Sequence, residues 1–288
     1  MLKKIYQRFS YWVLPPGIQN VLKRSYFFLK NQKLNKFERQ LLNKNKELKG
    51  RHQGERCFIL ATGASIRNQD LSLLKHEFCI AVSNFYLHPN FHTICPKYYC
   101  LAPWHPPHKE FDYVQLLEEA GHCANESTFF LGISERLRVQ ENSIQLGKGV
   151  YYLKFGGVNA EIISPDINLT QSILSPQSVS IMALQVAIFM GFSRIYLLGF
   201  DHDSILNFGE GFANKHFYTE NKSKLITDRE TFKSALLSYL SLWNEYEIIK
   251  KVAANRKIHI YNSTHGGLLD VFDRVNYENL IHGKETFS

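Results

Sequence analysis

Apolar segments of two lengths alternate along the chain from residue 57 onward. Short runs rich in β-branched and aromatic residues predict strands, and longer runs with apolar positions at helical spacing predict helices. The predicted strands are 57–62, 78–83, 98–101, 128–133, 194–200 and 257–261, and the predicted helices are 70–76, 110–120, 177–190 and 230–254. Because such alternation is typical of parallel sheets covered on both faces, we expect an α/β fold with three layers and a mostly parallel, Rossmann-like sheet.

Two stretches do not fit this alternation. Residues 17–49 have apolar positions at helical spacing within a polar and basic sequence, and the glycines of 50–54 form a hinge after them. Residues 134–175 contain several glycines and no clear period, which indicates a lid or small subdomain over a pocket. We therefore expect a helical arm over 1–53 and a single α/β domain over 54–288.

Three of the predicted strands end in polar or small residues. Residues 58–65 read FILATGAS, while the runs at 79–87 and 194–203 read CIAVSNFYL and RIYLLGFDHD. Small residues after the first strand allow close approach of a phosphate or ribose, and their N–H groups can face an anion. Since ligands collect at the carboxyl ends of parallel strands, we expect a nucleotide-type pocket there. The turn fits neither GxGxxG nor GxxxxGK[ST], so an ordinary β-to-α turn is the alternative.

The net charge of +8 is unevenly distributed. Residues 1–53 contain 13 Lys and Arg but only two acidic residues, whereas the rest of the chain contains 21 Lys and Arg and 24 Asp and Glu. Aromatic residues accompany the basic ones, and this combination suits an anionic membrane surface. Clustered lysines also suit nucleic acid, but no nucleic-acid-binding motif accompanies them, so we expect no nucleic-acid partner. A solvated extension or a contact in a homo-oligomer is the remaining interpretation.

The cysteines and the apolar runs indicate the compartment. Five cysteines without a CxxC pair are typical of reduced thiols rather than of a disulfide framework or a zinc site. No window approaches the roughly 18 apolar residues of a membrane span, and Arg8 and Pro15 interrupt the N-terminal apolar run. We therefore expect a cytoplasmic protein without a signal peptide, peripheral on the inner face of the membrane.

Four motifs together resemble those of known proteins. They are ATGAS at 61–65, SNFYL at 83–87, QSVS at 177–180 and IYLLGFD at 195–201. They resemble the MptE-like family, which includes 6-hydroxymethylpterin diphosphokinase-like proteins and flagellin motility accessory factors. They are similar, more distantly, to bacterial sialyltransferases of glycosyltransferase family 42. The resemblance covers about residues 55–275 and implies a sialyltransferase variant of the GT-A-like fold.

The resemblance also implies a set of nucleotide contacts. Those in the first two motifs are Thr62, Gly63, Ala64, Ser65 and Asn84, with Gly63 and Ser65 at the phosphates and Asn84 at the sugar or phosphate. Ser178 and Ser180 would hold a carboxylate or phosphate at the N-terminus of their helix. Three positions depart from the sialyltransferase pattern: Thr62 stands for an asparagine, Ala64 for a proline and Pro176 for an arginine. These departures leave the donor sugar open.

A histidine follows the third polar strand end after a glycine-rich loop. His216, in KHFYTE, resembles in its placement the sialyltransferase histidine that acts as general base. An imidazole suits this role because it titrates near neutrality. Tyr218 is expected to hold the leaving phosphate and Glu220 to orient the ring. An incidental loop histidine is the alternative.

Further polar residues at strand ends are candidates for chemistry. His265, in STHGG, is a second candidate base, and Trp104 and His105, in WHPPH, could touch an acceptor. The prolines of WHPPH forbid a helix and make a zinc pair improbable. Asp201, a catalytic candidate, forms a D-x-D pair with Asp203 that could hold Mg²⁺ or Mn²⁺, although Asp201 could equally bond a loop. Enzymes of the sialyltransferase type are metal-independent, so we expect no required cofactor.

The resemblance implies a glycosyltransferase that uses a CMP-activated keto-acid sugar, such as a sialic acid-like nonulosonate or Kdo. Its acceptor would be a bacterial surface glycan or a lipid-linked glycoconjugate. The mechanism would be inversion by direct displacement. Two alternatives stay open: an ATP- and Mg²⁺-dependent 6-hydroxymethylpterin diphosphokinase-like enzyme, and a nucleotide-binding protein without catalysis.

Overall fold

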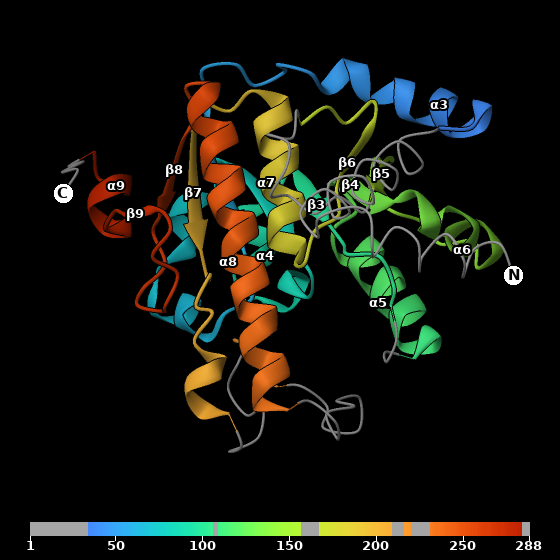
Figure 1. The fold of residues 1–288 in the computed structure, drawn as a ribbon. Helices are drawn as coiled ribbons and strands as arrows, with labels where there is room; N and C mark the ends of the chain where they lie inside the picture. Colours follow the sequence, from blue (N-terminus) through green and yellow to red (C-terminus); the bar gives the residue numbers. More distant parts are fainter. Residues whose placement is uncertain (1–33, 106–108, 157–166, 209–215, 220–230, 284–288) are drawn as a thin grey trace, which may run out of the picture.

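The structure is a computed structural model that describes residues 34–105, 109–156, 167–208, 216–219 and 231–283 (Figure 1). Nine strands form one sheet in the order β6-β5-β4-β3-β2-β1-β7-β8-β9, and every neighbouring pair is parallel. The strands are β1 (Arg56–Leu60), β2 (Phe78–Val82), β3 (Tyr98–Cys100), β4 (Thr128–Gly132), β5 (Gly149–Gly156), β6 (Ser172–Leu174), β7 (Arg194–Leu198), β8 (His259–Asn262) and β9 (Asp273–Arg274). The predicted parallel α/β sheet is thus confirmed.

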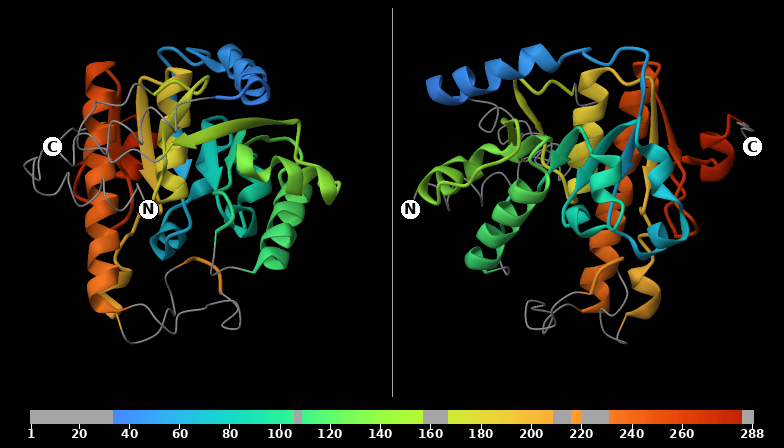
Figure 2. Two further views of the ribbon diagram at one scale, coloured as in Figure 1. Left: turned by 45° about the vertical axis from the view of Figure 1, so that its right-hand side comes forward. Right: turned by 180° about the vertical axis from the view of Figure 1, so that it is seen from behind.

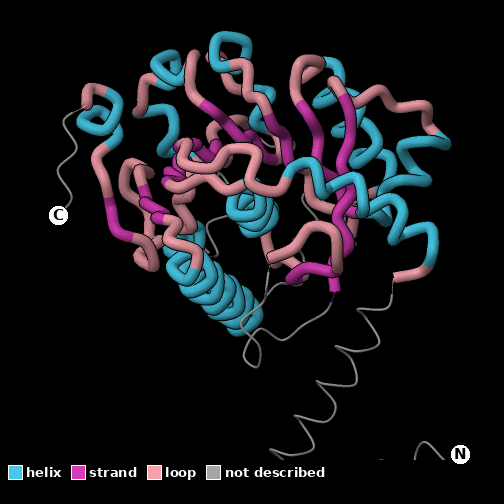
Figure 3. The backbone as a smooth tube through the Cα atoms, turned by 90° about the horizontal axis from the view of Figure 1, so that it is seen from above, coloured by secondary structure: helices cyan, strands magenta, loops and turns pink. Residues whose placement is uncertain are grey.

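Helices cover both faces of this sheet, as Figures 2 and 3 show. α7 (Val179–Met190) and α8 (Phe232–Asn255) pack on one face, and α4 (Phe91–Ile94), α5 (Glu110–Cys123) and α9 (Tyr277–Ile281) pack on the other. Successive residues of β1 point to opposite faces, so Ile59 joins the first core and Phe58 the second. Because both faces are covered, the central strands are apolar throughout, and this explains the short apolar runs.

α7 is the most deeply buried helix of the described chain, since eleven of its twelve residues are buried. The Ser178 hydroxyl caps its N-terminus by accepting a hydrogen bond from the Ser180 N–H over 3.1 Å. Gly191 ends the helix in the left-handed region at φ +86°, which a glycine adopts without strain. The sequence therefore encodes both the length of this helix and its place between two layers.

The chain changes direction across the sheet between β1 and β7. From β1 it proceeds through β2 to β6 on one side, then returns to place β7 on the other side of β1. Such a reversal is a topological switch point, and the carboxyl ends of the two strands leave a crevice for a ligand there. The polar loops after β1 and β7 therefore meet at the edge where the sequence predicts a pocket.

Several predicted boundaries need correction. The predicted helix 70–76 is replaced by the 3₁₀ turn η3 (Leu71–Leu74), which follows another 3₁₀ turn, η2 (Ala64–Asn68). Residues 134–175 are not irregular throughout, because they form η5 (Ile133–Glu135), α6 (Arg136–Glu141), β5 and β6. β5 begins and ends in glycine and lies next to the edge strand β6, and more than half of its residues are only half-buried. Residues 157–166 of that stretch lie outside the described residues.

The described part of the predicted arm belongs to the body. α3 (Lys36–Asn43) and η1 (Lys44–Leu48) pack along β5, and Leu42 and Leu48 are fully buried. Asn45 Nδ2 donates to the carbonyl oxygens of Tyr152 at 2.9 Å and Leu169 at 2.7 Å. The boundary at residue 53 therefore does not separate two independent parts. Residues 1–33 lie outside the described residues, and among the residues described we find no helix that could span a bilayer.

Candidate functional site

The loops after β1 and β7 form one hydrogen-bonded unit at the switch point. The Gly63 N–H donates to the Gly199 carbonyl oxygen over 3.0 Å. The Ser65 N–H donates to Asp201 Oδ2 over 2.8 Å, and the Ser65 hydroxyl donates to Asp201 Oδ1. The carboxylate of Asp201 thus occupies the position where we expected the turn to meet a ligand anion.

Asp201 is only 5% exposed, and burial raises the pKa of its carboxyl against the lowering effect of the hydrogen bonds from Ser65. Both carboxylate oxygens already accept hydrogen bonds, which leaves Asp201 poorly placed to bind a cation with Asp203. Within the described chain, no three His, Cys, Asp or Glu side chains form a group that could hold a metal ion.

Gly63 serves close packing rather than an unusual backbone conformation. A Cβ at this position would lie 2.4 Å from the Gly199 carbonyl oxygen and 2.6 Å from Asp201 Cγ. Its φ of −58° is open to any residue, so the backbone conformation does not require a glycine here. The glycine is required because the loops after two adjacent strands touch here.

His216 is held against the first loop. An antiparallel bridge pairs it with Gly63, and the Phe217 N–H donates to the Thr62 carbonyl oxygen over 3.0 Å. His216 Nδ1 lies 2.9 Å from Thr62 Oγ1 and 3.2 Å from the Thr62 carbonyl oxygen. The imidazole also stacks on the Tyr218 ring, with centroids 5.1 Å apart and planes 5° from parallel. Contacts with Thr62 and stacking on Tyr218 therefore both hold the imidazole in its orientation.

Two cavities adjoin at His216. The smaller, of about 230 Å³, lies between the loops after β1 and β7 and the start of α7. The larger, of about 490 Å³, lies between the ends of β2 and β3 and the side of α5. Ser83, Val179 and His216 line both. A ligand bridging the two would therefore pass between the N-terminus of α7 and the imidazole.

The structure distributes the candidate residues over these cavities. Thr62, Gly63, Ser178, Ser180, Asp201 and Asp203 line the smaller cavity; Asn84, Trp104, His105 and Tyr218 line the larger; His216 lines both. Ala64 and Ser65 line neither, and the exposed loop residue His265 also lines neither. Glu220 lies outside the described residues.

A polar network behind the smaller cavity was not anticipated from the sequence. His202 Nε2 lies 2.8 Å from the Tyr246 hydroxyl, and burial lowers the pKa of this histidine to about 4. Burial raises the pKa of the Tyr246 hydroxyl, so this hydroxyl stays protonated. His202 sits in the sequence Asp-His-Asp, but its partner in α8 lies 44 residues away, and no local pattern pairs them. Neutral His202 therefore joins the loop after β7 to α8.

Comparisons with known proteins give a likeness in fold. No protein-family model matches the chain, and no curated protein matches it. One similar solved structure is the sialyltransferase CstII from Campylobacter jejuni in complex with the substrate analogue CMP-3FNeuAc. It is 14% identical over 76% of this chain and 85% of that chain, with a TM-score of 0.44. Another, of the same enzyme with cytidine-5'-monophosphate, is 15% identical over 76% and 84%, with a TM-score of 0.45.

Proposed function

We propose that this protein is a glycosyltransferase that moves a sugar from a nucleotide-activated donor to an acceptor hydroxyl. The observation that carries the proposal is the meeting of two cavities at His216, beside the N-terminus of α7. A transferase needs one site for the donor, one for the acceptor, and a proton acceptor between them. The arrangement supports all three.

The donor phosphate fits at the start of α7. Ser178, Val179 and Ser180 line the smaller cavity there, at the end of the helix where the macrodipole favours an anion. Asp203 and Tyr239 line the same cavity and offer a carboxylate and a hydroxyl to ribose hydroxyls. The resemblance of the four motifs points to CMP as the nucleotide and to a keto-acid sugar as the group attached to it.

His216 is the proposed general base. A carbonyl oxygen can only accept a hydrogen bond, so the contact between Nδ1 and the Thr62 carbonyl assigns the ring proton to Nδ1. This tautomer puts the lone pair on Nε2. As the acceptor oxygen bonds to the anomeric carbon, its proton passes to Nε2, and the bond from that carbon to the phosphate oxygen breaks. The nucleotide leaves with its charge at the start of α7, and the anomeric configuration inverts.

The N-terminal segment is proposed to bind the membrane and so to bring the protein to a lipid-linked acceptor. Residues 1–33 contain seven Lys and Arg and no acidic residue, together with several aromatic residues. Each basic residue near an anionic leaflet contributes about 1 kcal/mol of binding free energy. We therefore propose a peripheral protein of the cytoplasmic membrane face.

The test is calorimetry of the full chain with CMP, CDP, UDP, GDP and ATP, each with and without Mg²⁺. We expect CMP to bind without metal and Asp203→Asn to weaken it, while Glu247→Gln on the exposed side of α8 leaves it unchanged. Preferential binding of ATP with Mg²⁺ would contradict the proposal in favour of the diphosphokinase-like alternative. CMP binding without consumption of any CMP-activated keto-acid sugar would indicate the non-catalytic alternative.

A further inference from the structure

Exposed apolar side chains gather at one end of the described structure. Of the twelve large apolar side chains that are exposed in the described chain, six lie in two short stretches. The first stretch comprises the 3₁₀ turn η6 (Ser204–Asn207) and the residue after it, and the second is the first nine residues of α8. The six side chains are those of Leu206, Phe208, Phe232, Leu236, Leu237 and Leu240. A protein rarely exposes so many large apolar groups in one place unless they bind a partner.

The two stretches form one continuous surface. The rings of Phe208 and Phe232 lie with their centroids 5.2 Å apart and their planes at 61°. Further along both elements, the hydroxyl oxygens of Ser204 and Tyr239 lie 2.5 Å apart. The turn η6 is therefore held against α8, and its apolar residues extend the apolar surface of the helix. We call this surface, made by the six exposed residues, the apolar end.

The apolar end projects from the body (Figures 1 and 2). Ala235 is the only buried residue between Phe232 and Leu240, whereas five residues from Glu245 to Ala253 are buried. Phe232, Leu236 and Leu240 are spaced four residues apart, so they form one row along the helix. An apolar row on a helix of a globular protein normally faces the core. Here the row faces outward.

The charge of the apolar end is complementary to an anionic surface. Residues 204–208 and 231–243 contain one charged side chain, Lys233, and no acidic side chain. Residues 54–288 as a whole contain 24 Asp and Glu against 21 Lys and Arg. Acidic side chains are thus common in the body and missing from this stretch of sequence. Because anionic lipids repel carboxylates, the apolar end is the part of the body that an anionic bilayer can accept.

The N-terminal segment favours a bilayer over a second copy of this chain as the partner. Residues 1–33 contain seven Lys and Arg and no acidic residue, and they lead directly into α3. When extended, 33 residues span up to about 110 Å, so this segment can reach the bilayer on which the apolar end docks. Stable membrane binding takes two components, such as a basic segment and an inserted apolar group. The chain has both, whereas a dimer needs only the apolar one.

The apolar end also adjoins the smaller cavity. Ser204 and Tyr239 line that cavity, and Leu206 and Leu240 of the apolar end follow them by two residues and one residue. An apolar end inserted in a bilayer would therefore hold the smaller cavity at the membrane surface. The glycan of a lipid-linked acceptor lies at that surface.

We infer that the apolar end inserts into an anionic lipid bilayer at the boundary between headgroups and acyl chains. It acts together with residues 1–33 and orients the body with the cavities towards the membrane. The inference rests on the proposed function, because it adds to the proposed peripheral binding the surface of the body that contacts the lipid.

The test is sedimentation of the full chain with liposomes of phosphatidylcholine and phosphatidylglycerol at about 0.1 M and about 0.5 M salt. Leu237→Glu should lower the partition coefficient at least about fivefold, because a carboxylate replaces an inserted apolar group. Leu137→Glu is the matched control. Leu137 lies in α6 and is 57% exposed, as Leu237 is, and this substitution should leave the partition coefficient within twofold of wild type.

Two further variants guard against loss of folding. Leu240→Glu should repeat the effect of Leu237→Glu at a second exposed position. Leu237→Trp should strengthen binding about threefold, since an indole is favoured at the membrane interface, and a misfolded variant would not give this gain. High salt should weaken the contribution of residues 1–33 and leave the ratio between wild type and Leu237→Glu unchanged, because salt does not screen apolar burial.

Equal liposome binding by wild type and Leu237→Glu would overturn the inference. If removal of residues 1–33 still released the protein in that case, the proposed peripheral binding would stand without the apolar end. Light scattering measures the oligomeric state of the same variants. Loss of a dimer in Leu237→Glu with unchanged liposome binding would assign the surface to a second copy and overturn the inference. Liposome binding that depends on Leu237 in a protein that binds no nucleotide would support the inference and overturn the transferase.

Discussion

The Ser65 N–H donates a hydrogen bond to the carboxylate of Asp201 over 2.8 Å, although 136 residues separate them. This contact joins the loops after β1 and β7 at the switch point of the sheet. The carboxylate of Asp201 thus accepts a hydrogen bond from an N–H of the first loop that could otherwise bind an external anion. The proposed site for the donor phosphate is therefore the start of α7, which also lines the smaller cavity.

The first prediction concerns the stability that this contact provides. Asp201→Ala should lower the free energy of unfolding by about 2–3 kcal/mol, since it leaves the partly buried Ser65 N–H without its charged acceptor. Asp203→Ala, at a more exposed position of the same loop, should change it by less than about 0.5 kcal/mol. Urea denaturation measures both. Equal effects of the two variants would show that the contact with Ser65 contributes nothing to stability.

The second prediction concerns Gly63. Gly63→Ala should destabilise the fold by about 1–3 kcal/mol, because its Cβ would approach the Gly199 carbonyl oxygen and the Asp201 carboxylate at impossible distances. Gly63→Val should be worse. Urea denaturation measures the change in the free energy of unfolding. Calorimetry with CMP on the folded fraction measures the effect on nucleotide binding. Wild-type stability combined with loss of nucleotide binding would instead make Gly63 a ligand contact.

The third prediction compares two histidines. His216→Ala should lower the rate of sugar transfer about 10²–10⁴-fold, as expected for loss of a general base, with CMP affinity within a few-fold of wild type. His265→Ala should transfer at nearly the wild-type rate, since His265 is exposed and lines neither cavity. Steady-state kinetics with a CMP-activated keto-acid sugar tests the pair. The opposite result would exchange their roles.

The fourth prediction concerns pH and Glu245. This carboxyl is 7% exposed, and burial raises its pKa to about 7, against the lowering effect of a hydrogen bond from the Gln177 N–H. The folded state therefore binds more protons than the unfolded state between the ordinary pKa of 4.5 and about 7. The free energy of unfolding should accordingly fall as the pH rises through this interval.

Glu245→Gln should remove that part of the slope and stabilise the protein above pH 7 relative to wild type. Glu247→Gln, on the exposed side of α8, should leave the slope unchanged. Urea denaturation at several pH values between 4.5 and 8 measures all three proteins. A slope that persists in Glu245→Gln would assign it to other groups.

The fifth prediction concerns the basic N-terminal segment. Removal of residues 1–33 should release the protein from anionic liposomes, and binding of the intact chain should weaken as salt rises. The cut is placed before residue 34 because α3 and η1 are part of the packed body. Sedimentation with liposomes, together with thermal unfolding of the truncated chain, tests this. Equal sedimentation of both proteins would assign residues 1–33 another role.

The sequence by itself determined the elements that composition and period encode. The apolar runs of β1, β2 and β7 and the all-round apolar character of α7 follow from burial between two layers, and burial leaves a local signature in every residue. Polar residues at the ends of these strands could be predicted to gather at one edge. The strand β5 was not predicted because it begins and ends in glycine, within a stretch that has no clear period.

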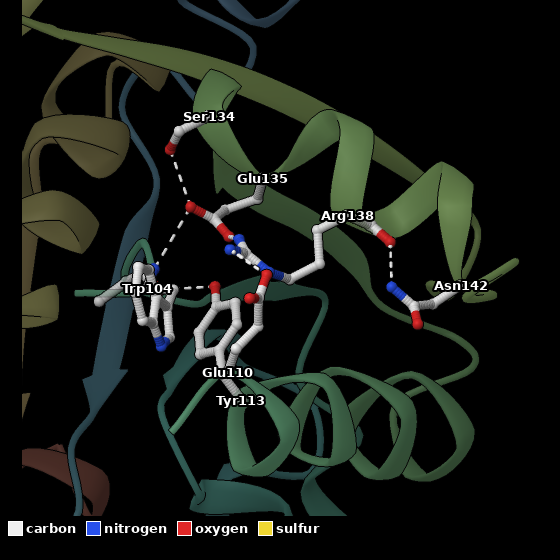
Figure 4. Close-up of polar contacts among 8 residues, drawn as sticks. Trp104, Glu110, Tyr113, Ser134, Glu135, Arg138 and Asn142 are labelled. Carbon is white, nitrogen blue, oxygen red and sulfur yellow. Dashed lines mark hydrogen bonds and ion pairs between the residues drawn. The ribbon is translucent and has the colours of Figure 1, made fainter. Parts of the chain in front are cut away.

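Only the tertiary structure decided which of these polar residues meet. His216 contacts Thr62 across 154 residues, and the Trp104 backbone N–H donates to the Glu135 carboxylate, which belongs to a different element (Figure 4). Periodicity reports on neighbours within about four positions, whereas these contacts depend on the order of the strands and on the direction in which the chain crosses the sheet. The pairing of Ser65 with Asp201, the division into two cavities and the contact of Glu135 with the Trp104 backbone therefore follow from the packing of distant segments, which no local pattern contains.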